Sequence, residues 1–405
     1  MRDAERLSRS GFSPEFRLAI ATSMWPDGAE RVRRIEAALE SPVDWDLFVR
    51  IARRHRIEGL AFHGLSASTS APEAVHAALR DAAERQANKS LAFAAENLRV
   101  SQLLQEAGIP CASLKGASLS MLTFGTLALR HSRDVDLVVP PEHALRADEV
   151  LAAAGYGLHM PIGPHSLAQK VHWIRQRKHF EYIGEKNMAM ELHWRLFDNP
   201  RLLSTELNPA TWMEVPIFAK RSLRTLSMPD LLLYLCVHGA NHMWFRLKWL
   251  ADVHALLRQG LPEMLERLEA DGKQEGCERA VSQALALMQE LYEFPPPEVR
   301  PSVNPASSAL VKEALQAMTA GKAAAELETI PFATSRIAAA RFRLKEGWLF
   351  RLAETRTVLA DEHDRRSLRV PHSMRFLLPV IRVPMWVWRR LRGQGRSHRG
   401  VDLEG

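Results

Sequence analysis

Apolar residues recur at helical spacing over the first quarter of the chain. Between residues 14 and 110, pairs such as Ile35 and Leu39 stand four residues apart among alanine, arginine and glutamate, which is the pattern of amphipathic helices. Residues 41–44 predict a break and the start of the next helix. We therefore predict a helical N-terminal region.

The pattern changes between residues 108 and 139. Gly108 and Pro110 end a helix, and the following CASLKGASLSMLTFG predicts a short strand, a glycine turn and a helix. Next comes RDVDLVV (133–139), which predicts a second strand closed by prolines. Residues 142–155 return to a helix that ends at a glycine. This alternation of strands and helices indicates an α/β element.

A β-hairpin is predicted over residues 179–196. HFEYI and MAMELHWRL flank a four-residue turn at 184–187. Side chains of a strand alternate between its two faces. Glu191 and His193 therefore share one face of the second strand, and the other is apolar, with Met188, Met190, Leu192 and Trp194.

After residue 228 the pattern is helical again. Helices are predicted over 229–239, 243–258, 262–271, 276–293, 308–320 and 335–358, with a proline-rich linker at 295–308. We predict a helix-rich α+β fold, in which a small mixed β-sheet is flanked by N- and C-terminal helical regions. The predicted regions are 1–107 (helical), 108–225 (α/β core), 226–325 (helical, walling the cleft) and 326–405 (helical, with an arginine-rich tail).

Composition narrows the class of protein. The chain is 46% hydrophobic and 25% charged, which is ordinary for a globular protein. No apolar run is long enough for a membrane span, and the N-terminus does not resemble a signal peptide. Its three cysteines are far apart, so we expect reduced thiols and a cytoplasmic protein.

Positive charge is concentrated at the C-terminal end. The net charge is +7, which favours polyanionic partners. Residues 365–399 contain ten arginines and no acids, interleaved with apolar residues. This tail fits an anionic membrane surface or a nucleic acid, or equally a terminal helix with an apolar face packed on the domain.

Two carboxylates interrupt an otherwise apolar strand. Asp134 and Asp136 share one face of RDVDLVV, and like charges so close together favour a bound cation. Glu191 is a third acid on a strand, and Gly116 marks a turn at which backbone amides can approach phosphates. Carboxylates and phosphate oxygens are how Mg²⁺ is usually held. The residues thus predict metal-dependent phosphoryl or nucleotidyl transfer.

These motifs resemble the nucleotidyltransferase superfamily of the DNA polymerase beta type. More narrowly, the chain looks like an uncharacterised bacterial subgroup with an LKG turn, an arginine four residues before the first aspartate, and a [DE]LHW strand. The matching residues here are Leu114–Gly116, Arg130 and Glu191–Trp194, and a segment at 238–252 also resembles the subgroup. Ala117 follows the turn glycine where many superfamily members have serine, and the third acid is glutamate where aspartate is commoner.

The resemblance implies roles for individual residues. Asp134, Asp136 and Glu191 would bind Mg²⁺ or Mn²⁺ and form the catalytic centre, with Glu191 also a candidate base. The turn of Lys115, Gly116 and Ser118 would bind the nucleotide. Arg130 would either hold the loop before the acids or contact phosphate. Candidate cleft residues are His193, His238, His242, Arg246 and Lys248.

Alternatives exist for several of these residues. The acids could be solvated or paired with arginines, and His193 could be a packed histidine. His238 and His242, four apart on a helix, lack the glutamate of a zinc motif. His159, His165, His172 and His179 do not have the spacing of a metal site and are assigned to a flexible, partly exposed stretch.

The predicted function is transfer of NMP from an NTP, ATP among the candidates, to an acceptor hydroxyl or phosphate, with release of pyrophosphate. A small-molecule or protein acceptor is favoured over nucleic acid. A non-catalytic nucleotide-binding or regulatory protein is one alternative. A scaffold held at a membrane surface by residues 365–399 is another. The nucleotide base, the acceptor, the number of metal ions and the oligomeric state stay open.

Overall fold

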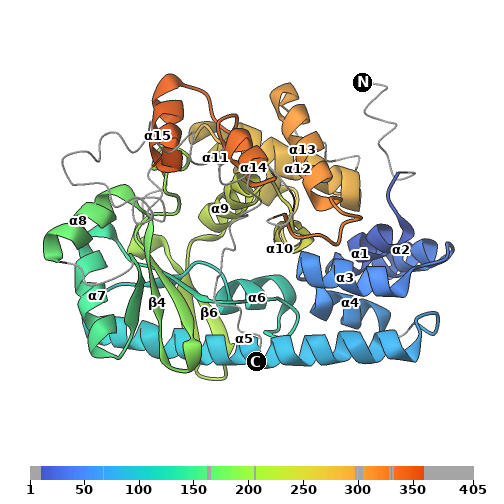
Figure 1. The fold of residues 1–405 in the computed structure, drawn as a ribbon, viewed down its shortest axis with the longest axis horizontal. Coiled ribbons are helices and arrows are strands. Elements are labelled where there is room, and N and C mark those ends of the chain that lie inside the picture. The colour runs from blue at the N-terminus through green and yellow to red at the C-terminus, as the bar shows by residue number, and fades with distance from the viewer. Residues whose placement is uncertain are drawn as a thin grey trace, which may run out of the picture.

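The fold is helix-rich α+β, as predicted (Figure 1). The computed structural model describes residues 11–66, 68–161, 166–204, 207–296, 299, 304–327, 330 and 333–359. The helices in this part of the chain are α1 (Pro14–Ser23), α2 (Ala29–Leu39), α3 (Trp45–His55), α4 (Glu58–Leu65), α5 (Glu73–Glu106), α6 (Ala117–Phe124), α7 (Ala144–Ala153), α8 (Leu167–Gln176), α9 (Met228–Asn241), α10 (Leu247–Leu257), α11 (Glu263–Gln274), α12 (Glu278–Tyr292), α13 (Ser308–Met318), α14 (Ala333–Arg341) and α15 (Trp348–Leu359). The strands are β1 (Ala112–Ser113), β2 (Val135–Val138), β3 (Gly157–Met160), β4 (His179–Ile183), β5 (Ala189–His193), β6 (Met213–Phe218) and β7 (Arg221–Thr225).

Five of the strands form one mixed sheet. Their order is β1-β2-β5-β4-β3, with β2 parallel to β5 and the other neighbours antiparallel. The register places Asp136 of β2 beside Glu191 of β5, and Glu191 beside Glu181 of β4. Three acids from three strands therefore lie in one row across the sheet.

The two faces of this sheet differ, as strand alternation predicts. Val135, Leu137 and Leu192 belong to a buried cluster with Val100 of α5 and Leu151 of α7. The acids and His193 project from the opposite face. The hydrophobic face is thus closed by helices, and the polar face is the one available for chemistry.

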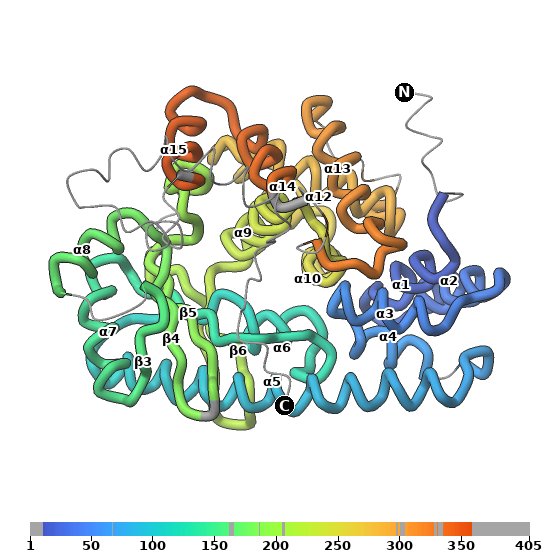
Figure 2. Tube along the Cα trace, in the orientation of Figure 1, coloured from blue at the N-terminus to red at the C-terminus, as the bar shows by residue number. Residues whose placement is uncertain are grey.

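Helix α5 connects the two halves of the molecule. Its 34 residues correspond to a length of about 51 Å. It contacts α3 and α4 on one side and α6, α7, β2 and β7 on the other. Figure 2 shows it running beneath both the N-terminal helices and the sheet. The position of the N-terminal helices relative to the sheet therefore depends on this one helix.

Several elements differ from the prediction. The stretch before the hairpin contains β3 and α8, and a second hairpin, β6–β7, follows it. The predicted helix 335–358 is two helices, α14 ending at Arg341 and α15 starting at Trp348. Gly347, directly before α15, has a φ of 102°, which side chains rarely adopt. Residues 365–399 lie outside the described residues, as does His165. The predicted region boundaries stay predictions.

Two further expectations can be compared with the structure. Cys111, Cys236 and Cys277 are buried and free of disulfides, as expected. Among the described residues, none of the helices combines the length and apolarity needed to cross a membrane.

The predicted helix 243–258 starts late, at Leu247, because the chain turns sharply at Trp244. Met243 and Trp244 have φ of 56° and 48°. The Trp244 amide donates to the carbonyl of Gly239, 2.8 Å away, and the buried indole covers the α-carbon of Gly239. The turn from α9 to α10 therefore requires a residue without a side chain at position 239.

Gly239→Ala tests this turn. In an unobstructed helix the change stabilises by about 1 kcal/mol, but here the added Cβ overlaps the Trp244 ring, which costs about 1–3 kcal/mol. We expect net destabilisation in urea unfolding. The control is Gly157→Ala, where the nearest atom is 3.7 Å away, and a change within about 0.5 kcal/mol is expected. Stabilisation by Gly239→Ala would contradict the tight turn.

Candidate functional site

The three predicted acids lie together on the polar face of the sheet. Asp136 is buried and paired in register with Glu191, and Asp134 precedes β2 by one residue on the same face. Burial raises the pKa of Asp134 to about 7, and the charges of Asp136 and Glu191 add to the shift. Mutual repulsion of this kind is relieved by a cation.

Lys115 supplies one positive charge to the acids. Its Nζ lies 3.6 Å from Asp136 Oδ1 and 5.9 Å from the ring centroid of Tyr234 on α9. Burial alone would raise the pKa of Asp136, but Lys115 and the close approach of His193 hold it at about 2. Burial alone would lower the pKa of Lys115, but the negative charge of Asp136 raises it above the usual value.

His193 stands between two of the carboxylates. Its Nε2 lies 3.0 Å from Glu191 Oε2 and 3.4 Å from Asp136 Oδ1. Burial alone would raise the pKa of Glu191, but His179, Lys178 and His193 hold it well below its usual range. Glu191 is therefore a carboxylate in this site.

A group of potential metal ligands includes one residue that the sequence did not suggest. Among the described residues, the ligand atoms of His179, Glu191 and His193 all lie within 4.8 Å of one another. The spacing of the histidines along the chain gave His179 no metal-binding role, whereas the hairpin register places His179 directly opposite His193. Spacing along the chain does not reveal a cross-strand pair.

The glycine turn before α6 is held by a buried hydrogen-bond network. Gly116 has φ 66° and ψ −124°, a conformation that favours glycine. Asn97 of α5 donates to the Ser113 hydroxyl, which donates to the carbonyl of Lys115 (2.8 Å). The Ser118 hydroxyl donates to the same carbonyl, 3.2 Å away. Ser118 thus stabilises the turn, and the first amides of α6 lack helical partners.

Residues 130–132, which lead into the acids, are fixed from two sides. Gln86 and Ser90 of α5 donate to the carbonyls of Ser132 and Arg130. The Arg130 guanidinium donates two hydrogen bonds, of 2.9 and 3.0 Å, to the Asp252 carboxylate of α10. Arg130 was predicted either to hold the loop before the acids or to contact phosphate. Its hydrogen bonds to Asp252 agree with the first of these roles.

The remaining predicted cleft residues divide into two groups. His238 and His242 have ring centroids 4.7 Å apart, next to Trp249. Burial lowers the pKa of both well below the usual range, and the charge of Lys115 adds to the shift. Both imidazoles are therefore neutral. Arg246 instead is buried and paired with Glu326 at 2.8 Å.

Positive charge gathers on the Asp134 side of the acids. Lys248 of α10 donates to the carbonyl of His131 at 3.1 Å, and burial and the charges of Arg130 and Arg56 lower its pKa well below the usual range. Burial lowers the pKa of Arg56 to about 9, with contributions from Arg246 and Arg133. Arg56, at the end of α3, was missed, and its only signal is the basic run RRHR.

The family model described as uncharacterised nucleotidyltransferase matches residues 41–293. This range covers more than half of the chain and includes the three acids, the glycine turn and α10. The chain belongs to this nucleotidyltransferase family. The resemblance inferred from the motifs is thereby confirmed, and membership implies transferase activity. No curated protein matches the chain.

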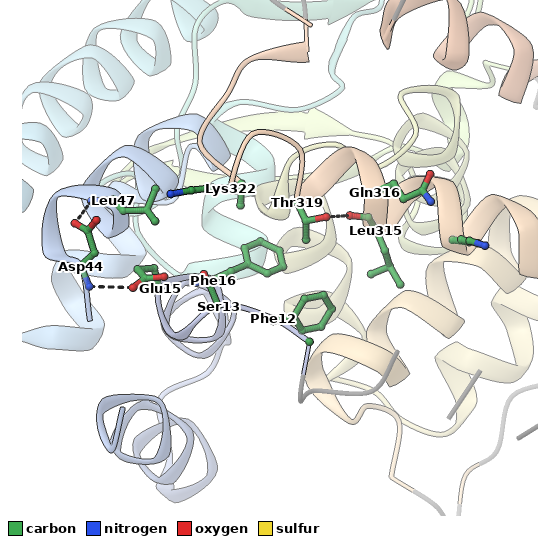
Figure 3. Close-up of a pocket in the computed structure, with 13 residues that line it drawn as sticks. Phe12, Ser13, Glu15, Phe16, Asp44, Leu47, Leu315, Gln316, Thr319 and Lys322 are labelled. Carbon is green, nitrogen blue, oxygen red and sulfur yellow. Dashed lines mark hydrogen bonds between the residues drawn. The ribbon is translucent and has the colours of Figure 1, made fainter. Parts of the chain in front are cut away.

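A cavity of about 630 Å³ lies elsewhere in this family member, between α1, the start of α3 and α13 (Figure 3). None of the predicted site residues lines it. Its acids have structural roles, since Glu15 accepts from the Asp44 amide and Asp44 accepts from the Leu47 amide, both at 2.9 Å. Most of its lining residues also lie outside the matched range. We therefore assign no chemistry to it.

Removing one partner of the Arg130–Asp252 pair should destabilise the transferase strongly. The two side chains are 4% and 1% exposed, so Arg130→Met leaves a buried carboxylate without its partner, at a cost of about 3–5 kcal/mol. Urea unfolding measures the change.

The control is Arg146→Met, in an exposed pair with Glu149 (both 64% exposed), where we expect less than about 1 kcal/mol. Equal effects of the two substitutions would mean that the buried pair does not hold the segment before the acids.

Proposed function

We propose that this nucleotidyltransferase transfers NMP from an NTP to a hydroxyl or phosphate of a small molecule or protein, with release of pyrophosphate, and that it depends on Mg²⁺ or Mn²⁺. One observation carries the proposal. The parallel register of β2 and β5 aligns Asp136 with Glu191, and Asp134 adds a third carboxylate on the same face. Converging carboxylates of this kind suit a hard divalent cation and phosphate oxygens.

Asp134, Asp136 and Glu191 are the proposed metal-binding and catalytic residues. When bound, the ion would supply Lewis-acid activation and neutralise charge on the phosphates. The chain contributes the electrostatic conditions, because burial, and after it repulsion from Asp136 and Glu191, raises the pKa of Asp134. Lys115 stabilises the ionised form of Asp136, which keeps one ligand charged at neutral pH.

The nucleotide would lie between the glycine turn and the basic residues near Asp134. Gly116 allows close approach of phosphate to the first amides of α6, and Lys115 lies beside them. Arg56, Arg133 and Lys248 would receive the triphosphate. The charge of Asp134 acts on both Arg56 and Lys248, which places them on this side of the acids. His238 and His242 are proposed to contact the base or the acceptor.

A non-catalytic nucleotide-binding protein is less well supported, because all three acids are present and share one face. Binding of an anionic membrane through residues 365–399 stays a prediction. The location in the cytoplasm likewise stays a prediction.

Calorimetric titration tests the metal-dependent binding of nucleotide. Each of the four NTPs is titrated with Mg²⁺ or Mn²⁺ into the intact protein and into Asp134→Asn/Asp136→Asn. Each lost charge-assisted contact is worth about 1.5–3 kcal/mol, so we expect binding at least roughly a hundredfold weaker in the variant. The matched control is Glu214→Gln, an exposed strand acid on β6, which should bind like the intact protein.

If the folded intact protein binds none of the NTPs, the proposed reaction is wrong in its simple form. If Asp134→Asn/Asp136→Asn binds NTP as well as Glu214→Gln does, the nucleotide site lies elsewhere.

Arg56→Gln tests the placement of the triphosphate. Because the guanidinium would contact only the outer phosphates, we expect about a tenfold loss of NTP affinity and little change for the corresponding NMP. Arg53→Gln is the control, because Arg53 is exposed one turn earlier on α3. Equal losses for NTP and NMP would contradict this placement.

A further inference from the structure

His193 is a buried imidazole whose hydrogen bonds are unmade. The residue is 0% exposed, and neither ring nitrogen has a hydrogen-bond partner. Its Nε2 nevertheless lies 3.0 Å from Glu191 Oε2 and 3.4 Å from Asp136 Oδ1. An N–H directed at one of these oxygens would form a hydrogen bond at such distances. Convergence without a hydrogen bond is what ligand atoms around a common ion show.

His179 completes the same donor group from the neighbouring strand. Its ring centroid lies 5.0 Å from that of His193. Its Nε2 lies 3.1 Å from Glu181 Oε1, and its buried Nδ1 has no hydrogen-bond partner. A carboxylate on one ring nitrogen fixes the tautomer and leaves the other nitrogen with its lone pair free for a metal.

We propose that His193 and His179 are direct ligands of the divalent ion, together with Glu191, and that the site therefore selects a first-row transition ion over Mg²⁺. This inference rests on the proposed function and changes its cofactor. Mg²⁺ takes oxygen ligands almost entirely, whereas imidazole nitrogen suits later first-row ions such as Fe²⁺, Ni²⁺ and Zn²⁺. The row of acids alone would not make this distinction.

The competing interpretation is a protonated His193 that forms ion pairs with both carboxylates. In that arrangement the imidazole would add positive charge to the site and would oppose a cation. The two interpretations differ in whether nitrogen is bonded to the ion, which spectroscopy measures without any assay of activity.

Pulsed EPR of Mn²⁺ bound to the intact protein tests the proposal without nucleotide. Coupling of ¹⁴N to the electron spin reports directly bonded nitrogen, and protein grown with ¹⁵N-histidine should replace it with ¹⁵N coupling. In His193→Gln we expect the coupling to diminish and the Mn²⁺ affinity to fall about tenfold or more. Mg²⁺ should displace Mn²⁺ only at a concentration at least about tenfold higher than Co²⁺ requires.

Two further variants keep the test decisive. His254→Gln is the matched control, because His254 is also buried but packs on Tyr292 and Phe294, and it should retain the coupling. His179→Gln changes a more accessible ligand (17% exposed), so it and the ¹⁵N substitution give the answer even if His193→Gln fails to fold.

Mn²⁺ that binds without nitrogen coupling, and is lost only in Asp136→Asn, would overturn this inference while leaving the proposed function intact. No Mn²⁺ binding to the folded protein, with or without NTP, would overturn both. If the intact protein binds no NTP but its bound Mn²⁺ shows nitrogen coupling, the result would count against the proposed reaction alone.

Discussion

Repulsion among carboxylates is the constraint on which the rest of this site depends. Asp134, Asp136 and Glu191 can share a mostly buried face only because positive charge is placed next to them. Lys115 lies beside Asp136, and Lys178 lies 3.9 Å from Glu191. For Asp134 no ion pair is found within the described residues, and burial together with the charges of Asp136 and Glu191 raises its pKa, although Lys115 and Lys248 oppose the shift. The unbalanced negative charge marks where a bound cation would be most stabilising.

The surrounding helices hold the backbone that carries these charges. Residues 130–132 are bonded to α5 through Gln86 and Ser90 and to α10 through Asp252 and Lys248. The glycine turn is bonded to α5 through Asn97. Three of these five contacts run from a side chain to a backbone carbonyl. They specify one loop conformation because an unpaired buried polar group would be costly.

Local patterns in the sequence predicted β1, β2, β4 and β5, the two faces of β2 and β5, and the three acids, but not β3, β6 or β7. Alternation separated Asp136 from Leu137 and Glu191 from Leu192, and the sheet keeps that division. Local patterns could not supply the pairing of strands, so they missed the position of His179 opposite His193. They also could not show that Arg130 meets Asp252, 122 residues away. The sharp turn at Trp244 depends on tertiary packing against Gly239, which propensity does not describe.

The length of α5 has a consequence for how this family can vary. Gln86 and Asn97 hold two separate loops from one uninterrupted helix. Inserting or deleting a residue between them would rotate one loop about 100° around the helix axis relative to the other. Changes of length should therefore be excluded from this interval and accepted at hairpin tips such as residues 184–187. Helix α5 therefore fixes the distance and the relative orientation of the glycine turn and the segment before the acids.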